Sequence, residues 1–528
     1  MPKLLPSHTM AKILLQFLVP VVIAGSSRAQ QSFGNVNAIN PVRLKAHLEF
    51  IASDEMEGRD TPSRGLDVAT LYVATQLKLW GATPAGDDGT FFQTVPMGQR
   101  FLVSNESAID FGGKFYEFGA GFKAASGAVK ATGGLIYVGH GFVFREQGID
   151  PYEGLDVKGK ILVVASGLPK NTSSADMNGL GKNYLTPELA AKKYGAVGII
   201  TIPDQAYRSS WTAKAGLQMG GLQLVESLKD PNRISNIVAG QDLTTALFKG
   251  EPVGASEAEL GVGAPERGFA FSAQKLIGLN IVERTTFSSA RNVVAIVPGN
   301  DEGLRKEFVA YGAHIDHLGG VPGSTDRIFN GADDDGSGTV SILEIAHAYL
   351  TGVRPKRSSL FVWHVGEEKG LIGSAYFTNH PTVNLANVIT QLNIDMIGRS
   401  RMPDDNKPAN RLLTGPNEIF VVGSTKMSSD LQRVSETVNR SFLNLSFNYR
   451  YDDPRDPSRI FYRSDHYNYA SKGIPIIFYF DGEHEDYHKV TDKVAKIDFE
   501  KMSRVAQTVY ATGWALANAD SRPVIDKT

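Results

Sequence analysis

Residues 313–319 read AHIDHLG, and residues 330–338 read NGADDDGSG. An apolar run that predicts a strand comes directly before the first stretch, and a helical pattern follows the second. The adjacent carboxylates of Asp333, Asp334 and Asp335 repel one another and resist burial, so we expect a cation close to them. His314 and Asp334 are therefore the first candidate residues of a metal site with hydrolytic chemistry.

Regular alternation of strand and helix patterns begins after Ser289. We predict strands at 292–297, 308–313, 360–365, 388–394, 419–422 and 474–480, and helices at 338–350, 427–439 and 499–517. Strands that read as continuous apolar runs and alternate with helices predict an α/β fold, with a mostly parallel mixed sheet between helices. Ligands of such sheets bind beyond the carboxyl ends of the strands.

Residues 115–270 have a different texture, with short apolar runs bounded by glycines. We predict strands at 134–139, 159–164 and 197–202, and a short helix at 186–194. No candidate catalytic residue falls in this segment, so we interpret it as an inserted, non-catalytic, β-rich domain. The catalytic domain is then built from residues 30–114, where the apolar spacing is helical, and residues 271–528.

The N-terminus has the pattern of a secretory signal peptide. Lys3 and Lys12 precede an apolar run, and small residues around Ala29 suit a signal peptidase. We predict cleavage after Ala29 and a secreted or periplasmic location. The apolar run is short for a membrane span, and no later stretch approaches that length, so we expect no span after signal removal.

The composition narrows the choice of partners. A formal net charge of −2 gives no basic surface, so nucleic acid is not an expected partner. The chain of 528 residues has no cysteine, so its two to three expected domains need packing or metal, not disulfides, for stability. The sequence does not determine the oligomeric state.

Further candidate residues follow other predicted strands. They are Glu367, Glu368, Asp395 and His488. Their wide separation in sequence does not suit a local finger motif, but it suits side chains gathered from several loops over one sheet. Zinc binds imidazole nitrogen and carboxylate oxygen, and two zinc ions sharing one carboxylate would use two histidines and three acids. That leaves Glu367 outside the metal shell, where it can move protons.

Six motifs in this order resemble the M28 family of zinc peptidases, which comprises aminopeptidases and carboxypeptidases on the α/β zinc-exopeptidase fold. They are AHIDHLG (313–319), GADDDGSG (331–338), EEKGLIGS (367–374), NIDMIG (393–398), SDH (464–466) and DYHKVTDKVAKID (486–498). Residues 53–59, SDEMEGR, resemble the lead-in segment of bacterial members. Residues 115–270 resemble a protease-associated domain, which would shape access to the cleft. The resemblance implies a hydrolase that acts on peptides.

The resemblance also implies two zinc ions and a role for each motif residue. It makes His314, Asp334 and Asp395 ligands of one ion, and His488, Asp334 and Glu368 ligands of the other. Asp334 would bridge the ions, and its peptide bond to Asp335 is expected to be cis.

The remaining roles concern the reaction itself. Glu367 is expected to act as general base and acid, Asp316 to orient His314, and Tyr487 to support the oxyanion. The resemblance favours an aminopeptidase. A carboxypeptidase would need a cation facing the substrate carboxylate, for which Arg399, Arg401 and Arg463 are candidates. A binding protein with an inactive site is a further alternative.

Neighbouring polar residues receive more ordinary interpretations. Strand alternation predicts that His317 turns away from His314. We expect His466 to support the site, His484 to lie at the surface and His364 to lie in a strand. Asp333 and Asp335 are expected to form local hydrogen bonds.

Overall fold

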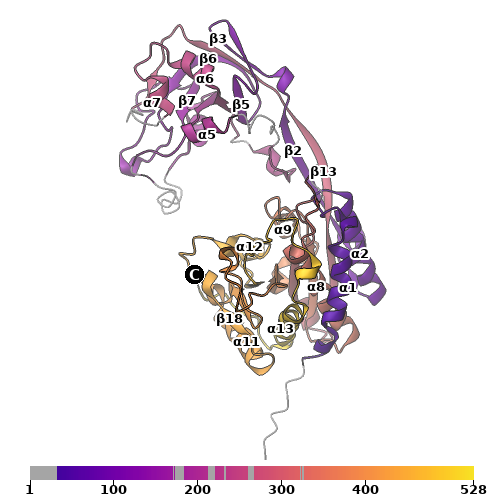
Figure 1. Cartoon of the computed structure of the whole chain (residues 1–528). Helices are drawn as coiled ribbons and strands as arrows, with labels where there is room; N and C mark the ends of the chain where they lie inside the picture. The colour runs from indigo at the N-terminus through magenta and orange to yellow at the C-terminus, as the bar shows by residue number, and fades with distance from the viewer. Residues whose placement is uncertain are drawn as a thin grey trace, which may run out of the picture. The chain divides into compact units, whose positions relative to one another are not determined.

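The computed structural model of the protein describes residues 33–170, 172, 184–211, 220–230, 233–259, 267–321, 323 and 326–527 (Figure 1). The predicted signal peptide, residues 1–29, lies outside these residues. Two sheets organise the described part of the chain, and each is packed against apolar cores of its own.

The first sheet carries the predicted α/β pattern. Its order is β18 (Ser446–Asn448), β17 (Glu418–Val422), β19 (Ile476–Phe480), β16 (Val388–Ile394), β14 (Phe308–His314), β15 (Ser358–His364), β13 (Glu283–Val297), β2 (Phe92–Leu102) and β9 (Gln223–Leu224), and β1 (Thr83–Pro84) also pairs with β13. The four strands β15, β14, β16 and β19 are parallel. Because β13 and β17 run antiparallel to their neighbours in this set, the sheet is mixed, and its parallel part is the centre.

Successive residues of the central strands face two different cores, as expected for a sheet covered on both sides. Val309 and Tyr311 of β14 belong to one core and Ala310 to the other. The helices of the first core are α1 (Pro41–Ile51), α2 (Arg64–Trp80), α8 (Gly338–Thr351), α11 (Ser429–Ser441) and α13 (Phe499–Asn518). Those of the second are α9 (Ile372–Asn379), α10 (Ser424–Met427) and α12 (His466–Ala470). The predicted α/β fold is thereby confirmed.

The helix predicted at 427–439 is α11, which begins two residues later than predicted. A separate short helix, α10, ends at Met427, and α11 begins at Ser429. Ser428 between them is extended, and its side chain accepts a hydrogen bond from the Leu431 N–H. The break therefore arises because Ser428 caps the second helix instead of continuing the first.

The second sheet is formed mostly by the segment predicted to be an insertion, residues 115–270. Its order is β4 (Lys114–Glu117), β3 (Ala108–Phe111), β12 (Leu276–Ile281), β6 (Val129–Tyr137), β7 (Ile161–Ala165), β8 (Gly198–Ile202), β10 (Asn236–Ala239) and β5 (Phe122–Ser126), with β11 (Phe269–Ala270) on β6. Helices α4 (Pro187–Tyr194), α5 (Gln205–Ser209), α6 (Gln241–Phe248) and α7 (Ala255–Glu259) accompany it. Its strands begin before residue 115 and end after residue 270. The assignment to a protease-associated domain stays a prediction.

Two long strands connect this segment with the first sheet. Strand β2 leads into the segment and β13 leads out of it, and they pair antiparallel from Phe92 with Val293 to Leu102 with Glu283 (Figure 1). Both connections between the two sheets therefore run through one hydrogen-bonded pair of strands.

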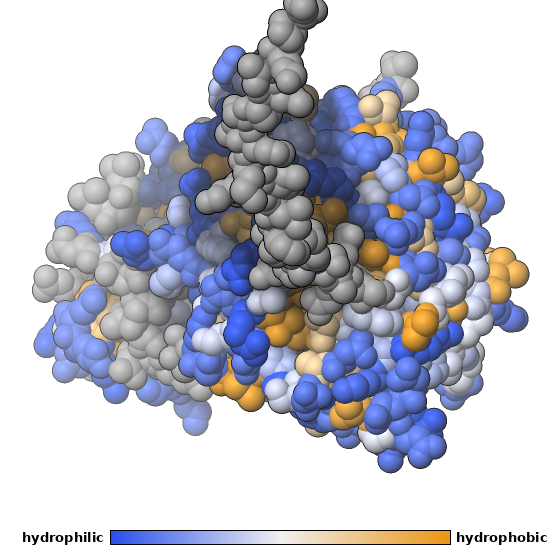
Figure 2. Space-filling model, turned by 90° about the horizontal axis from the view of Figure 1, so that it is seen from below, coloured by the Kyte–Doolittle hydropathy of each residue, from blue (hydrophilic) through white to orange (hydrophobic). Residues whose placement is uncertain are grey.

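No helix in the part of the chain that the structure describes has the length and apolar character needed to span a bilayer. On the face seen in Figure 2, hydrophobic residues lie in small groups among hydrophilic ones. Scattered exposed apolar side chains of this kind are common at protein surfaces.

Candidate functional site

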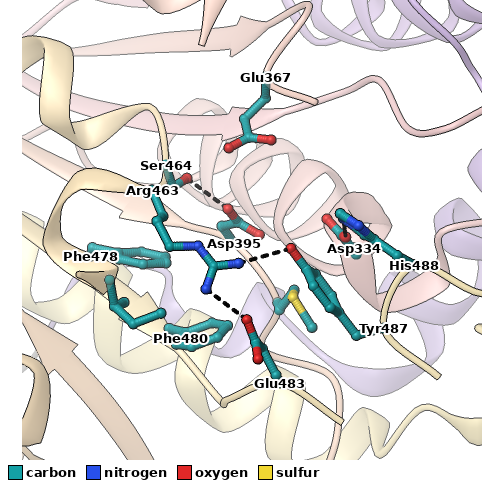
Figure 3. Close-up of a pocket in the computed structure, with 12 residues that line it drawn as sticks. Asp334, Glu367, Asp395, Arg463, Ser464, Phe478, Phe480, Glu483, Tyr487 and His488 are labelled. Atoms are coloured by element: carbon teal, nitrogen blue, oxygen red, sulfur yellow. Dashed lines mark hydrogen bonds and ion pairs between the residues drawn. The ribbon is translucent and has the colours of Figure 1, made fainter. Parts of the chain in front are cut away.

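The candidate side chains come from the carboxyl ends of the central strands. They are His314 at the end of β14, Asp334 in the turn Ala332–Ser337 before α8, Glu367 and Glu368 after β15, Asp395 after β16 and His488 after β19. Four of these residues, although distant in sequence, line one pocket: Asp334, Glu367, Asp395 and His488 (Figure 3).

Three of these side chains form a first group around His314. The Nε2 atom of His314 lies 3.2 Å from Oδ1 of Asp334 and 3.6 Å from Oδ1 of Asp395. The ligand atoms of all three residues lie within 4.8 Å of one another, and all three residues are buried. A single cation could contact all of them at once.

A second group lies on the other oxygen of Asp334. The Nε2 atom of His488 is 3.2 Å from Oδ2 of Asp334 and 3.2 Å from Oε2 of Glu368. Asp334 therefore directs one oxygen to each histidine. Figure 3 shows Asp334 beside His488. This is the arrangement that a carboxylate needs in order to bridge two cations.

Imidazole nitrogens and carboxylate oxygens at such spacing are donors that suit zinc. Oδ2 of Asp334 is buried and accepts no well-aligned hydrogen bond from the described residues. Burial lowers the pKa of His314, but Asp395 and Glu367 outweigh it and raise that pKa well above its usual value. Burial likewise lowers the pKa of His488, but Asp334 and Glu368 raise it to about 10. The site thus has a strongly negative potential, and its donor set fits a metal ion.

The two aspartates beside Asp334 bind the backbone. Oδ1 of Asp335 accepts hydrogen bonds from the N–H groups of Gly338 and Met396, and Oδ2 accepts one from His314. Oδ1 of Asp333 accepts a hydrogen bond from the Gly398 N–H. The predicted local bonding is confirmed for Asp335 with Gly338, but it is wrong for Asp333, whose partner Gly398 is 65 residues away. The Asp334–Asp335 peptide bond is cis, as the resemblance implied.

The prediction for His317 is wrong. Its Nδ1 atom lies 2.8 Å from Oε1 of Glu368 and 3.8 Å from Oδ2 of Asp334, and the side chain is fully buried. Strand alternation does not apply to His317, because β14 ends at His314 and the residues that follow form a loop. His317 is thus a third histidine at the site.

Asp316 contacts His314 through its main chain. The Nδ1 atom of His314 lies 3.1 Å from the carbonyl oxygen of Asp316, whereas the nearest carboxylate oxygen is 3.7 Å away. The carboxylate instead accepts hydrogen bonds from the Thr61 hydroxyl and the Glu367 N–H, at 2.8 and 3.2 Å. Asp316 therefore positions both His314 and the backbone of Glu367.

Glu367 lies across the pocket from Tyr487 and Glu483 (Figure 3). Its Oε2 atom is 3.9 Å from Nε2 of His314. Burial raises the pKa of Glu367 well above its usual value, His314 lowers it, and Asp395 and Glu368 raise it. A carboxyl group in this environment can hold a proton at a higher pH than an exposed one, which suits proton transfer.

The rest of the pocket has an apolar part and a charged part. The apolar part is Met396, Ile460, Phe478 and Phe480. Arg463 donates to Oε1 of Glu483 at 2.7 Å and to Oη of Tyr487 at 3.3 Å (Figure 3). The ring of Tyr487 stacks on His488, with the centroids 3.9 Å apart. These contacts hold the Tyr487 hydroxyl inside the pocket.

Two of the three remaining histidine predictions are consistent with the structure. His364 ends β15, and His466 is buried and stacks on Phe478 of the pocket. His484 is buried, with Nε2 3.2 Å from Oδ2 of Asp333, so its predicted surface location is wrong. Sequence patterns did not indicate this burial, because Asp333 is remote from His484 in the chain.

Comparison with known proteins gives a family match that includes the candidate site residues. Residues 292–513 match the model of Peptidase family M28. The chain is 29% identical over 260 residues to a probable zinc metalloprotease of Leptosphaeria maculans, covering 44% of this chain and 58% of that protein. It is 25% identical over 237 residues to a probable leucine aminopeptidase of Trichophyton verrucosum, covering 43% and 58%. The chain thus spans about half the length of the curated relatives it matches.

Among solved structures, an aminopeptidase from Aneurinibacillus sp. strain AM-1 has a similar fold. The TM-score is 0.51 at 17% identity, and the match covers 93% of this chain and 96% of that one. At this identity the likeness concerns the fold alone.

Proposed function

We propose, on the match of residues 292–513 to Peptidase family M28, that this chain is an exported aminopeptidase of that family with two zinc ions. It would hydrolyse the N-terminal residue from peptides. The observation that carries the proposal is the orientation of Asp334, whose two oxygens face His314 and His488 separately.

The five candidate ligands divide naturally into two sets that share Asp334. His314 and Asp395 would complete one metal position, and His488 and Glu368 the other. Zinc held there supplies a Lewis acid and lowers the pKa of water, so that a nucleophile forms near neutral pH.

Glu367 carries the proton in this proposal. Its carboxylate takes a proton from the attacking water and returns it to the leaving amine, which needs a group that exchanges protons near the working pH. The high pKa that burial gives to Glu367 supports this role. Asp316 holds the backbone of Glu367 and so fixes the place of transfer.

Tyr487 stabilises the negative charge that develops on the substrate carbonyl oxygen. Arg463 donates to Oη of Tyr487, so the hydrogen of that hydroxyl is free to point elsewhere. A hydroxyl held in this way can donate to an oxyanion. The apolar part of the pocket would bind the side chain of the N-terminal residue, with a preference for apolar residues.

The arginine contacts favour an aminopeptidase over a carboxypeptidase. Arg399 is buried and bonds to Oδ2 of Asp486 at 2.9 Å. Arg401 donates to main-chain oxygens. Arg463 reaches the pocket, but Glu483 neutralises it at 2.7 Å. A substrate carboxylate would have to compete with these partners. The alternative of an inactive binding protein is disfavoured because both histidines, all three acids and Glu367 are present.

The deciding experiment compares leucyl p-nitroanilide with its N-acetylated form. We expect hydrolysis of the free amine only, loss of activity with a chelator and recovery with zinc. Glu367→Gln should lower kcat by about 10²–10⁴, whereas Glu302→Gln at an exposed position should not change it. Full activity of Glu367→Gln, or fewer than one zinc per chain, would contradict the proposal. N-terminal sequencing of the exported protein tests cleavage after Ala29.

A further inference from the structure

The loop that follows α1 packs against the loops that carry the candidate metal ligands. Arg59 in this loop is 1% exposed, and its guanidinium donates to four main-chain carbonyl oxygens. The acceptors are Ile51 at 2.7 Å, Ile315 at 2.9 Å, Asn330 at 2.7 Å and Gly331 at 3.0 Å. No carboxylate of the described residues forms an ion pair with Arg59, so its contacts are to backbone.

Three of these acceptors, Ile315, Asn330 and Gly331, lie in two loops that carry candidate ligands, and the fourth, Ile51, is the last residue of α1. Ile315 directly follows His314, and Gly331 lies three residues before Asp334. The backbone adds to the connection, because the His317 N–H donates to the Arg59 carbonyl at 3.1 Å. Arg59 therefore fixes the spacing between the loop after β14 and the loop before α8.

Thr61 extends the same connection to a third loop. Its hydroxyl donates to Oδ2 of Asp316 at 2.8 Å and accepts from the Gly366 N–H at 3.1 Å. Gly366 immediately precedes Glu367. Residues 59–61 thus contact all three loops that bring His314, Asp334 and the two glutamates together.

We propose that Arg59 and Thr61 are positioning residues that hold these three loops at the spacing that metal binding requires. The inference rests on the metal site of the proposed function. A planar guanidinium bonds in fixed directions, which a lysine ammonium cannot reproduce. Burial lowers the pKa of Arg59 only to about 10, so the group remains charged at neutral pH and offsets the nearby acids.

A second buried arginine provides a matched control. Arg357 is also 1% exposed, and it bonds to Oε2 of Glu307 at 2.6 Å and to the carbonyl oxygen of Leu516. It lies directly before β15, and its side-chain hydrogen bonds to the described residues reach none of the three loops. Arg357→Lys should therefore destabilise the fold without changing the metal site.

The test measures zinc affinity by competition with a chromophoric chelator, on full-length protein verified as folded by thermal unfolding. Removal of outer contacts to metal ligands typically weakens binding about 10- to 100-fold. We expect this loss in Arg59→Lys, with a changed absorption spectrum of the cobalt-substituted protein, and near-normal affinity in Arg357→Lys. Equal zinc affinity of Arg59→Lys and the unchanged protein would overturn the inference.

Thr61→Val keeps the size and branching of the side chain but removes both hydrogen bonds of the hydroxyl. It is the second test variant if Arg59→Lys does not fold. We expect Thr61→Val to bind zinc more weakly than the wild-type protein, and an unchanged zinc affinity would then overturn the inference. If the wild-type protein binds no zinc, both the proposed function and the positioning role are wrong. If the wild-type protein binds zinc and the variants bind it equally well, only the positioning role is wrong.

Discussion

The hydroxyl of Ser464 donates a 2.6 Å hydrogen bond to Oδ2 of Asp395. The other oxygen of Asp395, Oδ1, faces Nε2 of His314. Ser464 also accepts a hydrogen bond from Asn393, which precedes Asp395 by two residues. The serine therefore fixes which oxygen of Asp395 is available to a metal ion.

Ser464→Ala should weaken binding of the zinc ion next to His314. Without the hydrogen bond the carboxylate of Asp395 can rotate, and such losses typically weaken metal binding about 10- to 100-fold. Zinc titration of the variant would measure this, with the exposed Ser471→Ala as control. Unchanged zinc affinity in Ser464→Ala would show that Asp395 needs no such support.

His317→Leu should weaken zinc binding at the second proposed metal position. His317 contacts Oε1 of Glu368 and so leaves Oε2 for the position shared with His488. We expect activity to fall at limiting zinc and to recover in excess zinc. His380→Leu, at an exposed pair with Glu226, is the matched control. A variant that needs no additional zinc would disprove this role of His317.

The sequence and its family resemblance indicated the candidate ligands, because each of these residues directly follows an apolar run or lies in a short motif. His314, Asp334 and Glu367 could be aligned in this way, and the structure brings them together. His317 was misjudged because the strand pattern was continued past the last residue of β14. Sequence motifs therefore indicated which residues meet, but not where the strand stops.

Arg59 and Thr61 illustrate a second limit. The contact between Arg59 and Ile315 joins residues 256 positions apart. Periodicity and spacing report on neighbours within a few turns or strands, so they carry no signal for such pairs. The resemblance of residues 53–59 to a lead-in segment therefore did not indicate which loops Arg59 would contact.

Glu344→Gln should reduce stability in a pH-dependent manner. Glu344 is fully buried in α8 and accepts hydrogen bonds from Arg43 at 2.6 Å and from His47 at 2.9 Å. Burial raises the pKa of Glu344, but the hydrogen bonds from His47 and Arg43 lower it by more than burial raises it. The net change in the pKa is therefore downward. A carboxyl group whose folded pKa lies below its unfolded value of about 4.3 stabilises the fold above that pH.

At neutral pH we expect the variant to lose about 2 kcal/mol in the free energy of unfolding, as for hydrogen bonds to charged groups. The difference between the two proteins should shrink as pH falls below about 4, through the folded pKa of Glu344. Urea unfolding over a pH series measures this. The exposed Glu49→Gln on α1 should change stability by no more than about 0.5 kcal/mol. A difference that is constant with pH would contradict the ionised role of Glu344.

Tyr487→Phe should lower kcat and leave KM nearly unchanged. The hydroxyl of Tyr487 would contact the substrate oxygen strongly only when that oxygen becomes negative, so its loss affects the transition state more than substrate binding. Removal of one such donor typically costs about 10²–10³ in kcat. Steady-state kinetics on leucyl p-nitroanilide separate the two constants. Zinc content should stay at the level of the unchanged protein, because the ring that stacks on His488 is retained. A rise in KM with constant kcat would instead assign Tyr487 to ground-state binding, and the oxyanion would then require another donor.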